Sequence, residues 1–341
     1  MSEEHHDAML WEPADGQAVR CGLCAHRCTI APGALGVCQV RKNVAGSLKS
    51  LNFSTLVAAN PDPIEKKPLF HVLPGTRSFS IAAPGCNFQC DFCQNWRISQ
   101  SPRAGRPLGG GGPGPQQIVD AAVESRCASI SYTYTEPTIF FELAYETARL
   151  AATRGLRNCF VSNGYMTPQA VRTIAPVLDA INVDLKAFSD QTYRRVMTAR
   201  LEPVLTCLKE LVAANVWVEV TTLVVPGMND SESELARIAA FIANDLGPHV
   251  PWHVSRFHGN YHMTDSPGTP IETLDTACRL GAEAGLKYVY CGNATGQADE
   301  STYCPSCGAV AIERFGYSIR RMDMAAGACG RCGEPLDGVW A

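Results

Sequence analysis

The sequence has no long hydrophobic run and little net charge. No stretch of about 18 apolar residues occurs in the 341 residues, so we expect no transmembrane helix. The acidic start of the chain lacks the basic segment and apolar run of a secretory signal, which favours a soluble, cytoplasmic protein. The formal net charge is only -4, with both signs interspersed, so we expect no membrane-surface or general nucleic-acid binding.

Cysteine, by contrast, is abundant. Sixteen cysteines in a large chain without a secretory signal favour metal ligation over disulfide bonds. Eleven of them fall into an amino-terminal group of four, a central group of three and a carboxy-terminal group of four. The other five stand singly in apolar patterns: Cys127, Cys159, Cys207, Cys278 and Cys291. We predict three metal sites, and interpret the five single cysteines as small buried hydrophobes.

Short β-rich runs alternate with helical patterns from Ser78 onward. The predicted strands are 79–84, 129–135, 158–163, 181–186, 216–225 and 252–257, and the predicted helices are 116–125, 139–153, 168–178, 205–214, 232–244 and 271–284. A last run at 286–292 adds a closing or edge strand. Such alternation predicts an α/β fold with a parallel sheet, a partial TIM-like (β/α)6 barrel. Functional side chains then belong on the loops after the strands.

The cysteine groups and this alternation divide the chain into four parts. Residues 1–50 form an amino-terminal Cys-rich metal-binding element, and residues 51–77 form a connector whose prolines predict irregular structure rather than long helices. Residues 78–295 form the catalytic core. Residues 296–341 form a tail too short for a sizeable core, so a bound metal would supply its folding free energy.

The central group, Cys86, Cys90 and Cys93, has C-x3-C-x2-C spacing in the first strand-to-helix loop. Four-iron clusters used only for electron transfer normally have four thiolate ligands. Three thiolates leave one iron open, and an open position marks a metal centre as catalytic, where S-adenosylmethionine (SAM) could bind. Phe92 could shield the cluster from water. The alternative is a zinc site completed by a distant ligand such as His71.

The motif CNFQCDFC in this setting resembles the radical SAM superfamily. In that family one electron from the reduced 4Fe-4S cluster cleaves SAM to methionine and a 5'-deoxyadenosyl radical, which abstracts hydrogen from substrate. The core is similar to activating enzymes of glycyl-radical enzymes such as pyruvate formate-lyase. The whole chain resembles the radical SAM member of the AmmeMemoRadiSam system, through CGLCAHRC, GVCQVRKN, SYTYTEPTIFFE, VSNGY, NVDLK, TTLVVPGMND, STYCPSCG and CGRCG.

The resemblance also implies contacts to SAM. The segment TYTEP stands where the superfamily has a glycine-rich segment ending in a glutamate that receives the SAM amino group, so Glu136 is the matching residue, although Tyr134 and Thr135 replace the usual glycines. Asp184 and Lys186 match a D-x-K element near the SAM carboxylate in glycyl-radical activating enzymes. The alternatives are a helix-capping role for Glu136 and an ordinary salt bridge for the other pair.

Polar side chains at two further strands are candidate ligand contacts. Ser162 and Asn163 end the third strand, where they could meet a ligand or form an ordinary turn. His253 lies in the sixth strand with Arg256 and His258 close in sequence, as a candidate substrate or adenosyl contact. A structural histidine is the alternative there.

Both flanking cysteine groups have the spacing of metal sites. The carboxy-terminal group consists of two C-x2-C pairs with the separation of a zinc ribbon: Cys304, Cys307, Cys329 and Cys332. The amino-terminal group has C-x2-C-x3-C-x9-C spacing: Cys21, Cys24, Cys28 and Cys38. His26 is an alternative ligand in this group. Zinc or an auxiliary iron-sulfur cluster suits four thiolates, and we favour structural zinc.

These observations predict an oxidoreductase or activase-like radical SAM enzyme with a 4Fe-4S cluster, SAM and zinc as cofactors. Its substrate is not identified. The expected partners are a reducing electron donor such as flavodoxin or ferredoxin and, from the resemblance, the other AmmeMemoRadiSam proteins. The alternative functions are an activating protein for a glycyl-radical enzyme, a noncatalytic zinc-dependent scaffold or nucleic-acid-binding module, and a redox sensor with an exposed cluster.

Overall fold

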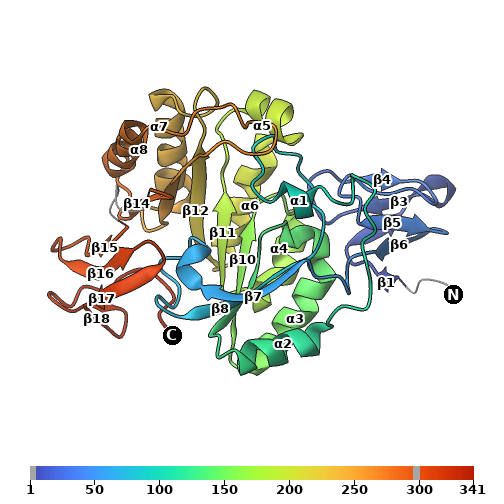
Figure 1. The fold of residues 1–341 in the computed structure, drawn as a ribbon, viewed down its shortest axis with the longest axis horizontal. Coiled ribbons are helices and arrows are strands. Elements are labelled where there is room, and N and C mark those ends of the chain that lie inside the picture. The colour runs from blue at the N-terminus through green and yellow to red at the C-terminus, as the bar shows by residue number, and fades with distance from the viewer. Residues whose placement is uncertain (1–4, 295–299) are drawn as a thin grey trace.

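An eight-stranded sheet forms the centre of the computed structural model, which describes residues 5–294 and 300–341 (Figure 1). Its strands are β7 (Ala58–Pro63), β8 (Arg77–Ala82), β9 (Ser129–Tyr132), β10 (Arg157–Ser162), β11 (Ala180–Asp184), β12 (Trp217–Val224), β13 (Trp252–Arg256) and β14 (Val289–Gly292). From β8 to β14 neighbouring strands are parallel and follow the sequence order. The outer strands β7 and β14 do not pair with each other, so the barrel is open. The predicted partial barrel is confirmed.

Helices follow the parallel strands and pack beside the sheet (Figure 1). The α-helices are α1 (Trp96–Ser99), α2 (Pro115–Glu124), α3 (Phe141–Thr153), α4 (Pro168–Ile174), α5 (Asp190–Met197), α6 (Leu201–Ala213), α7 (Glu232–Phe241) and α8 (Ile271–Glu283). Short 3-10 or π turns are η1 (Asp15–Gln17), η2 (Ile64–Lys66), η3 (Pro137–Phe140), η4 (Ala175–Val177) and η5 (Ile242–Leu246). Within the described residues, no helix has the length and apolar character needed to cross a membrane.

The connector is more regular than expected, because it contains β7. This strand pairs antiparallel with β8 at the edge of the sheet. Proline is tolerated in an edge strand because its missing N–H faces no partner strand, which explains how Pro61 and Pro63 lie in β7. After β7, the buried side chains of Ile64, Leu69 and Val72 pack against residues of β10 and β11.

Small sheets flank the barrel at both ends of the chain. The amino-terminal strands are β1 (His6–Asp7), β2 (Trp11–Pro13), β3 (Val19–Cys21), β4 (Thr29–Ile30), β5 (Arg41–Val44) and β6 (Ser47–Ser50). The carboxy-terminal strands are β15 (Thr302–Tyr303), β16 (Val310–Phe315), β17 (Ser318–Met322), β18 (Met324–Ala325) and β19 (Ala328–Cys329). Figure 1 shows these two groups on opposite sides of the barrel. The predicted boundary at residues 295 and 296 falls at the segment 295–299, which lies outside the described residues.

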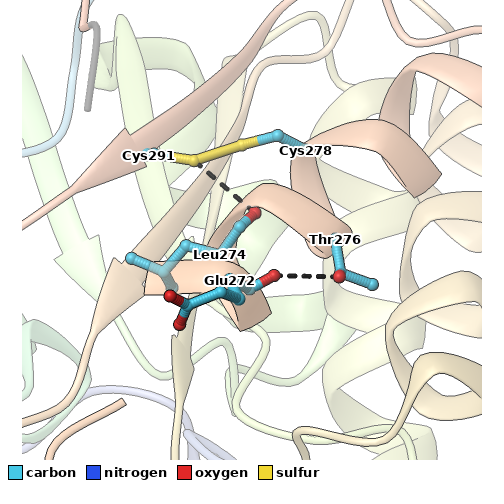
Figure 2. Close-up of a disulfide and its surroundings, with 5 residues drawn as sticks. All are labelled: Glu272, Leu274, Thr276, Cys278 and Cys291. Atoms are coloured by element: carbon cyan, nitrogen blue, oxygen red, sulfur yellow. Dashed lines mark hydrogen bonds between the residues drawn. A yellow bond between two sulfur atoms is a disulfide. The ribbon is translucent and has the colours of Figure 1, made fainter. Parts of the chain in front are cut away.

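A disulfide joins α8 to the edge strand β14. Cys278 and Cys291 form this bond, with a sequence separation of 13 residues (Figure 2). Our interpretation of these two cysteines as single buried hydrophobes is therefore wrong. The pairing depends on how α8 packs beside β14, which the sequence pattern does not reveal. Cys127, Cys159 and Cys207 are buried and free, as expected.

Candidate functional site

The loop between β8 and α1 carries the three central thiols. Cys86, Cys90 and Cys93 follow the carboxyl end of the first parallel strand. The backbone N–H of Phe88 donates to Cys86 Sγ at 3.4 Å, and Ser99 Oγ lies 3.3 Å from Cys93 Sγ. Polar hydrogens directed at sulfur stabilise the thiolate form that metal ligation needs. We refer to residues 83–95 as the cluster loop.

The donor set of this loop fits a cluster with one open iron. Burial raises the pKa of the Cys90 thiol to about 12, although the Lys186 ammonium favours the thiolate. Burial also holds the pKa of Cys86 well above its usual range. A metal binds the thiolate, so cluster assembly here would release protons. Phe92 is buried beside these ligands, which agrees with a role in excluding water.

Glu136 is fully engaged in hydrogen bonds at the end of β9. Its side chain accepts from the Thr138 backbone N–H at 3.0 Å, from the Thr138 hydroxyl at 2.5 Å, from the Ser162 hydroxyl at 2.8 Å and from the Asn163 backbone N–H at 2.7 Å. Burial raises the pKa of this carboxyl, while the four hydrogen bonds oppose that change. The structure thus shows the capping role of Glu136 on η3. Contact of Glu136, Ser162 and Asn163 with SAM stays a prediction.

Asn163 connects Glu136 to the cluster loop. Its Nδ2 donates to Asn87 Oδ1 at 2.7 Å and lies 3.9 Å from Cys86 Sγ. Asn87 is fully buried, and its own Nδ2 has no hydrogen-bond partner among the described residues. Because a buried unpaired donor is costly, this amide is a candidate contact for a group bound at the loop. We missed Asn87 in the sequence, although a polar residue next to a ligand cysteine was the available signal.

Tyr134 takes the backbone conformation that glycine adopts easily. Its φ of 64° lies in the left-handed region. The Tyr134 carbonyl accepts from Asn95 Nδ2 at 2.8 Å, and its hydroxyl donates to Asp62 on β7. Thr135 Oγ1 donates to the Ala83 carbonyl at 2.7 Å. The segment therefore keeps a glycine-like backbone at Tyr134 and is attached to both the cluster loop and the edge strand.

Asp184 and Lys186 form an ion pair after β11. Lys186 Nζ lies 2.8 Å from Asp184 Oδ2 and 5.8 Å from the centre of the Phe92 ring. Burial favours the neutral amine, but the Asp184 carboxylate and Cys90 raise the pKa of Lys186 above its ordinary value. The structure therefore brings this pair to the cluster loop. Its contact with SAM stays a prediction.

His253 lies elsewhere, in a buried network near the amino-terminal ends of β12 and β13. Its Nε2 bonds Glu219 Oε2 at 2.6 Å, and its ring stacks on Tyr290 with 5.1 Å between the ring centres. Glu219 also accepts from the backbone N–H groups of Phe70 and His71. The structure does not bring His253 together with Glu136 or Asp184, and gives it the structural role we held as the alternative.

His71 does not complete a zinc site with the central thiols. Its two ring nitrogens bond the Asp337 carbonyl at 2.6 Å and the Tyr290 hydroxyl at 2.7 Å. Arg256 likewise has a structural contact, from its Nε to the Thr269 carbonyl at 2.9 Å. The alternative of a zinc centre with His71 as fourth ligand therefore loses its support.

The four carboxy-terminal thiols converge. The Sγ atoms of Cys304 and Cys332 lie 3.6 Å apart, and those of Cys307 and Cys329 lie 3.8 Å apart. All four lie within 4.8 Å of one another. Tetrahedral zinc with bonds of about 2.3 Å to sulfur would place the sulfurs about 3.8 Å apart. This geometry fits the zinc-ribbon-like tail that the spacing predicts.

The amino-terminal thiols lie on β3 and in the loops that follow it. All four line one cavity, together with His26. Unlike the carboxy-terminal group, no three of them bring their sulfur atoms within 4.8 Å of one another among the described residues. The backbone of this element meets the core at an antiparallel bridge between Cys24 and Met166.

Comparisons with known proteins agree with this geometry. The family model described as "Radical SAM superfamily" matches residues 80–239 of the chain. The uncharacterized protein MJ0808 of Methanocaldococcus jannaschii is 44% identical over 333 residues, or 97% of this chain and 98% of that protein. A radical SAM methyltransferase from Sphaerobacter thermophilus matches with a TM-score of 0.51 and 14% identity, over 66% of this chain and 68% of that chain.

A second solved structure has a similar fold. Streptococcus suis SuiB bound to S-adenosylmethionine matches with a TM-score of 0.50 and 10% identity, over 67% of this chain and 53% of that chain. At these identities the likeness concerns the fold alone. The fold, the three-thiol loop after the first parallel strand and the family match agree with one another. The chain belongs to the radical SAM superfamily.

Proposed function

We propose that this protein is an enzyme that cleaves SAM reductively at a 4Fe-4S cluster held by Cys86, Cys90 and Cys93. When bound, the reduced cluster supplies the electron that converts SAM to methionine and a 5'-deoxyadenosyl radical, which removes hydrogen from an unidentified substrate. The observation that carries this proposal is the placement of three thiols on one loop, which Asn163 connects to Glu136.

The chain's own residues would bind and orient the cofactors. The three thiolates would hold three irons of a 4Fe-4S cluster and would leave the fourth open. Asn87 has a buried amide nitrogen at the loop that is unpaired within the described part of the chain and is suited to a ligand carbonyl or carboxylate. Lys186, partly buried and paired with Asp184, offers positive charge beside Cys90. Glu136 offers negative charge for an ammonium group. To bind it, the Glu136 carboxylate must accept from that group in addition to, or in place of, its present donors Thr138 and Ser162.

The carboxy-terminal tail has a structural role in this proposal. Zinc bound by its four thiols would supply folding free energy to a segment with a small core of its own. Arg314 on β16 anchors the tail, because its Nη2 donates to the Phe70 carbonyl at 2.7 Å. A flavodoxin or ferredoxin donor, the other AmmeMemoRadiSam proteins as partners, a cytoplasmic location and activation of a glycyl-radical enzyme stay predictions.

The test is SAM cleavage after anaerobic reconstitution with iron and sulfide and reduction with dithionite. We expect the wild type to form 5'-deoxyadenosine, measured by liquid chromatography with mass detection. Cys90→Ala should form little, while Cys127→Ala, which alters a buried cysteine away from the loop, should resemble the wild type. Equal deoxyadenosine yields from Cys90→Ala and the wild type would contradict the proposal.

A further inference from the structure

The amino-terminal cysteines surround a cavity with apolar and charged walls. Besides the four thiols, its lining includes Leu23, Ile30, Val37, Ile139 and Arg41. Cys21 and Cys38 are buried, and Cys24 and Cys28 are partly buried. Gly36 lines the cavity without a side chain. A Cβ at this position would lie 3.2 Å from the Ile30 side chain and 3.8 Å from Cys28 Sγ, and would occupy space beside that thiol. The thiols therefore face a shared, largely enclosed space.

The separation of these thiols differs from that of the carboxy-terminal group. Tetrahedral zinc would hold four sulfurs about 3.8 Å apart, and the carboxy-terminal sulfurs meet this distance. Neither the amino-terminal group nor the central three-thiol group brings three sulfurs within 4.8 Å among the described residues. A four-iron cluster is larger than one zinc ion and takes each thiolate on a different iron, so its ligands stand farther apart.

Arg41 supplies an unused donor at the same cavity. Its side chain is 2% exposed and is paired with the buried carboxylate of Glu142. Its Nη1 donates to the Met9 carbonyl at 3.1 Å, but its Nε has no hydrogen-bond partner among the described residues. Four thiolates around a metal carry net negative charge, and a buried cation with a free N–H stabilises such a group.

The cavity lies directly behind the cluster loop. His26 Nε2 bonds the Asn87 carbonyl at 2.8 Å. Arg103 bridges the two cysteine elements, because its Nη2 donates to the Val37 carbonyl at 2.7 Å and to the Cys86 carbonyl at 2.9 Å. The amino-terminal element is therefore packed against the loop that carries the central thiols.

We infer that Cys21, Cys24, Cys28 and Cys38 bind a second 4Fe-4S cluster rather than zinc. This inference reverses the expectation from sequence alone, and it does not depend on SAM cleavage. Among the described residues, no three of these sulfurs lie within 4.8 Å of one another, so the group lacks the close spacing that the carboxy-terminal thiols share with tetrahedral zinc. Four ligands would leave no iron open, so such a cluster would not bind SAM. His26 is not required as a ligand, because Cys38 supplies the fourth thiol.

The test is metal analysis of anaerobically purified, reconstituted protein. In the triple variant Cys86→Ala/Cys90→Ala/Cys93→Ala we expect about four iron and four sulfide per chain, against about eight of each in the wild type. The triple variant should also give the electron paramagnetic resonance signal of a reduced cluster. Zinc should stay at about one per chain, bound by the tail. A triple variant that holds no iron and about two zinc per chain would overturn the inference.

Two double variants test the inference independently, in case the triple variant does not fold. Cys24→Ser/Cys28→Ser in the otherwise wild-type protein should lose about four iron per chain and keep its zinc. Cys127→Ala/Cys207→Ala, which alters two free buried cysteines, is the matched control and should keep all its iron. Loss of zinc with unchanged iron from Cys24→Ser/Cys28→Ser would overturn the inference. Because metal content is the readout, the result is separate from the test of SAM cleavage.

Discussion

Asn163 Nδ2 donates to Asn87 Oδ1 at 2.7 Å, which joins the end of the third parallel strand to the loop after the first. The backbone N–H of Asn163 also donates to Glu136 at 2.7 Å. One residue thus positions side chains from three successive strand ends. Such a buried chain of hydrogen bonds holds its members in one geometry, because each polar group depends on its neighbour.

We predict that Asn163→Ala weakens SAM binding and cleavage while the iron content stays unchanged. The substitution leaves Asn87 Oδ1 without its donor, a loss on the order of 1 to 3 kcal/mol, so SAM affinity should fall about tenfold. Equilibrium binding of SAM to the reconstituted protein measures this. Asn244→Ala, on the exposed face of η5, is the control. Unchanged affinity in Asn163→Ala would show that this residue does not support the SAM site.

Lys186→Met tests the charge beside Cys90. The methionine side chain is close in size to the aliphatic part of lysine and has no charge, so a cluster at the loop loses a nearby cation. Because a positive charge favours the reduced, more negative cluster, the midpoint potential should become more negative in the variant. Potentiometric titration followed by paramagnetic resonance measures the potential. Lys209→Met, at an exposed ion pair on α6, is the matched control. An identical potential in both variants contradicts the prediction.

His71 predicts a pH dependence of stability. Burial lowers its pKa to about 4, although Glu219 favours the protonated ring. Between pH about 4 and about 6.5 the unfolded chain therefore binds more protons than the folded chain at this site. The contribution of the neutral His71 ring to the free energy of unfolding is complete above about pH 6.5. This contribution declines as the pH falls toward 4.

His71→Gln should make the stability less dependent on pH in that window, by up to about 1.4 kcal/mol per pH unit. Thermal unfolding at several pH values between 4 and 7 compares the two slopes. The slopes, rather than the absolute midpoints, are the readout, because glutamine also loses the bonds to Tyr290 and Asp337. Parallel pH profiles for wild type and variant would exclude His71 as the titrating group.

The bond between Cys278 and Cys291 predicts a redox-dependent stability. A cross-link that closes a loop of this size stabilises a protein by about 3 kcal/mol, so reduction or Cys278→Ser should lower the free energy of unfolding by a similar amount. Chemical denaturation measures the change, and peptide mapping after alkylation under nonreducing conditions identifies the cross-linked peptides. Cys207→Ser is the control. Full alkylation of both cysteines in oxidised protein contradicts the bond.

The location of the protein can be tested through the same disulfide. The predicted cytoplasmic environment keeps most thiols reduced. Rapid alkylation of intact cells, followed by mass analysis of the isolated protein, should then find Cys278 and Cys291 alkylated. Recovery of the cross-linked peptide from cells would argue against a reducing compartment.

Patterns of local sequence predicted the strands and helices well. The helix expected at 271–284 is α8 (Ile271–Glu283), and the strand expected at 252–257 is β13 (Trp252–Arg256). Such agreement arises because parallel strands are buried on both faces and read as apolar runs, whereas the intervening helices are amphipathic. The edge strand β7 was missed because its prolines indicate irregular structure, and only its position at the sheet edge permits them.

Residues from distant parts of the chain were harder to predict. His253 has the same sequence signal as a ligand-binding residue, but its bond to Glu219 places it in a structural network. Asn87 is recognised as a candidate site residue only through its hydrogen bond with Asn163. Both contacts join segments far apart in the sequence, so no local pattern encodes them.

The sequence by itself determined the α/β fold and the three-thiol motif of the superfamily, because strand periodicity and ligand spacing are short-range properties of the chain. It also predicted the tail's four-thiol site. Only the tertiary structure decided which side chains gather at the cluster loop, and that no three amino-terminal sulfurs lie within 4.8 Å of one another among the described residues. Those relationships depend on the packing of separate strands and loops against one another. The kind of metal that a site binds depends on the distances between its ligand atoms, which local sequence does not fix.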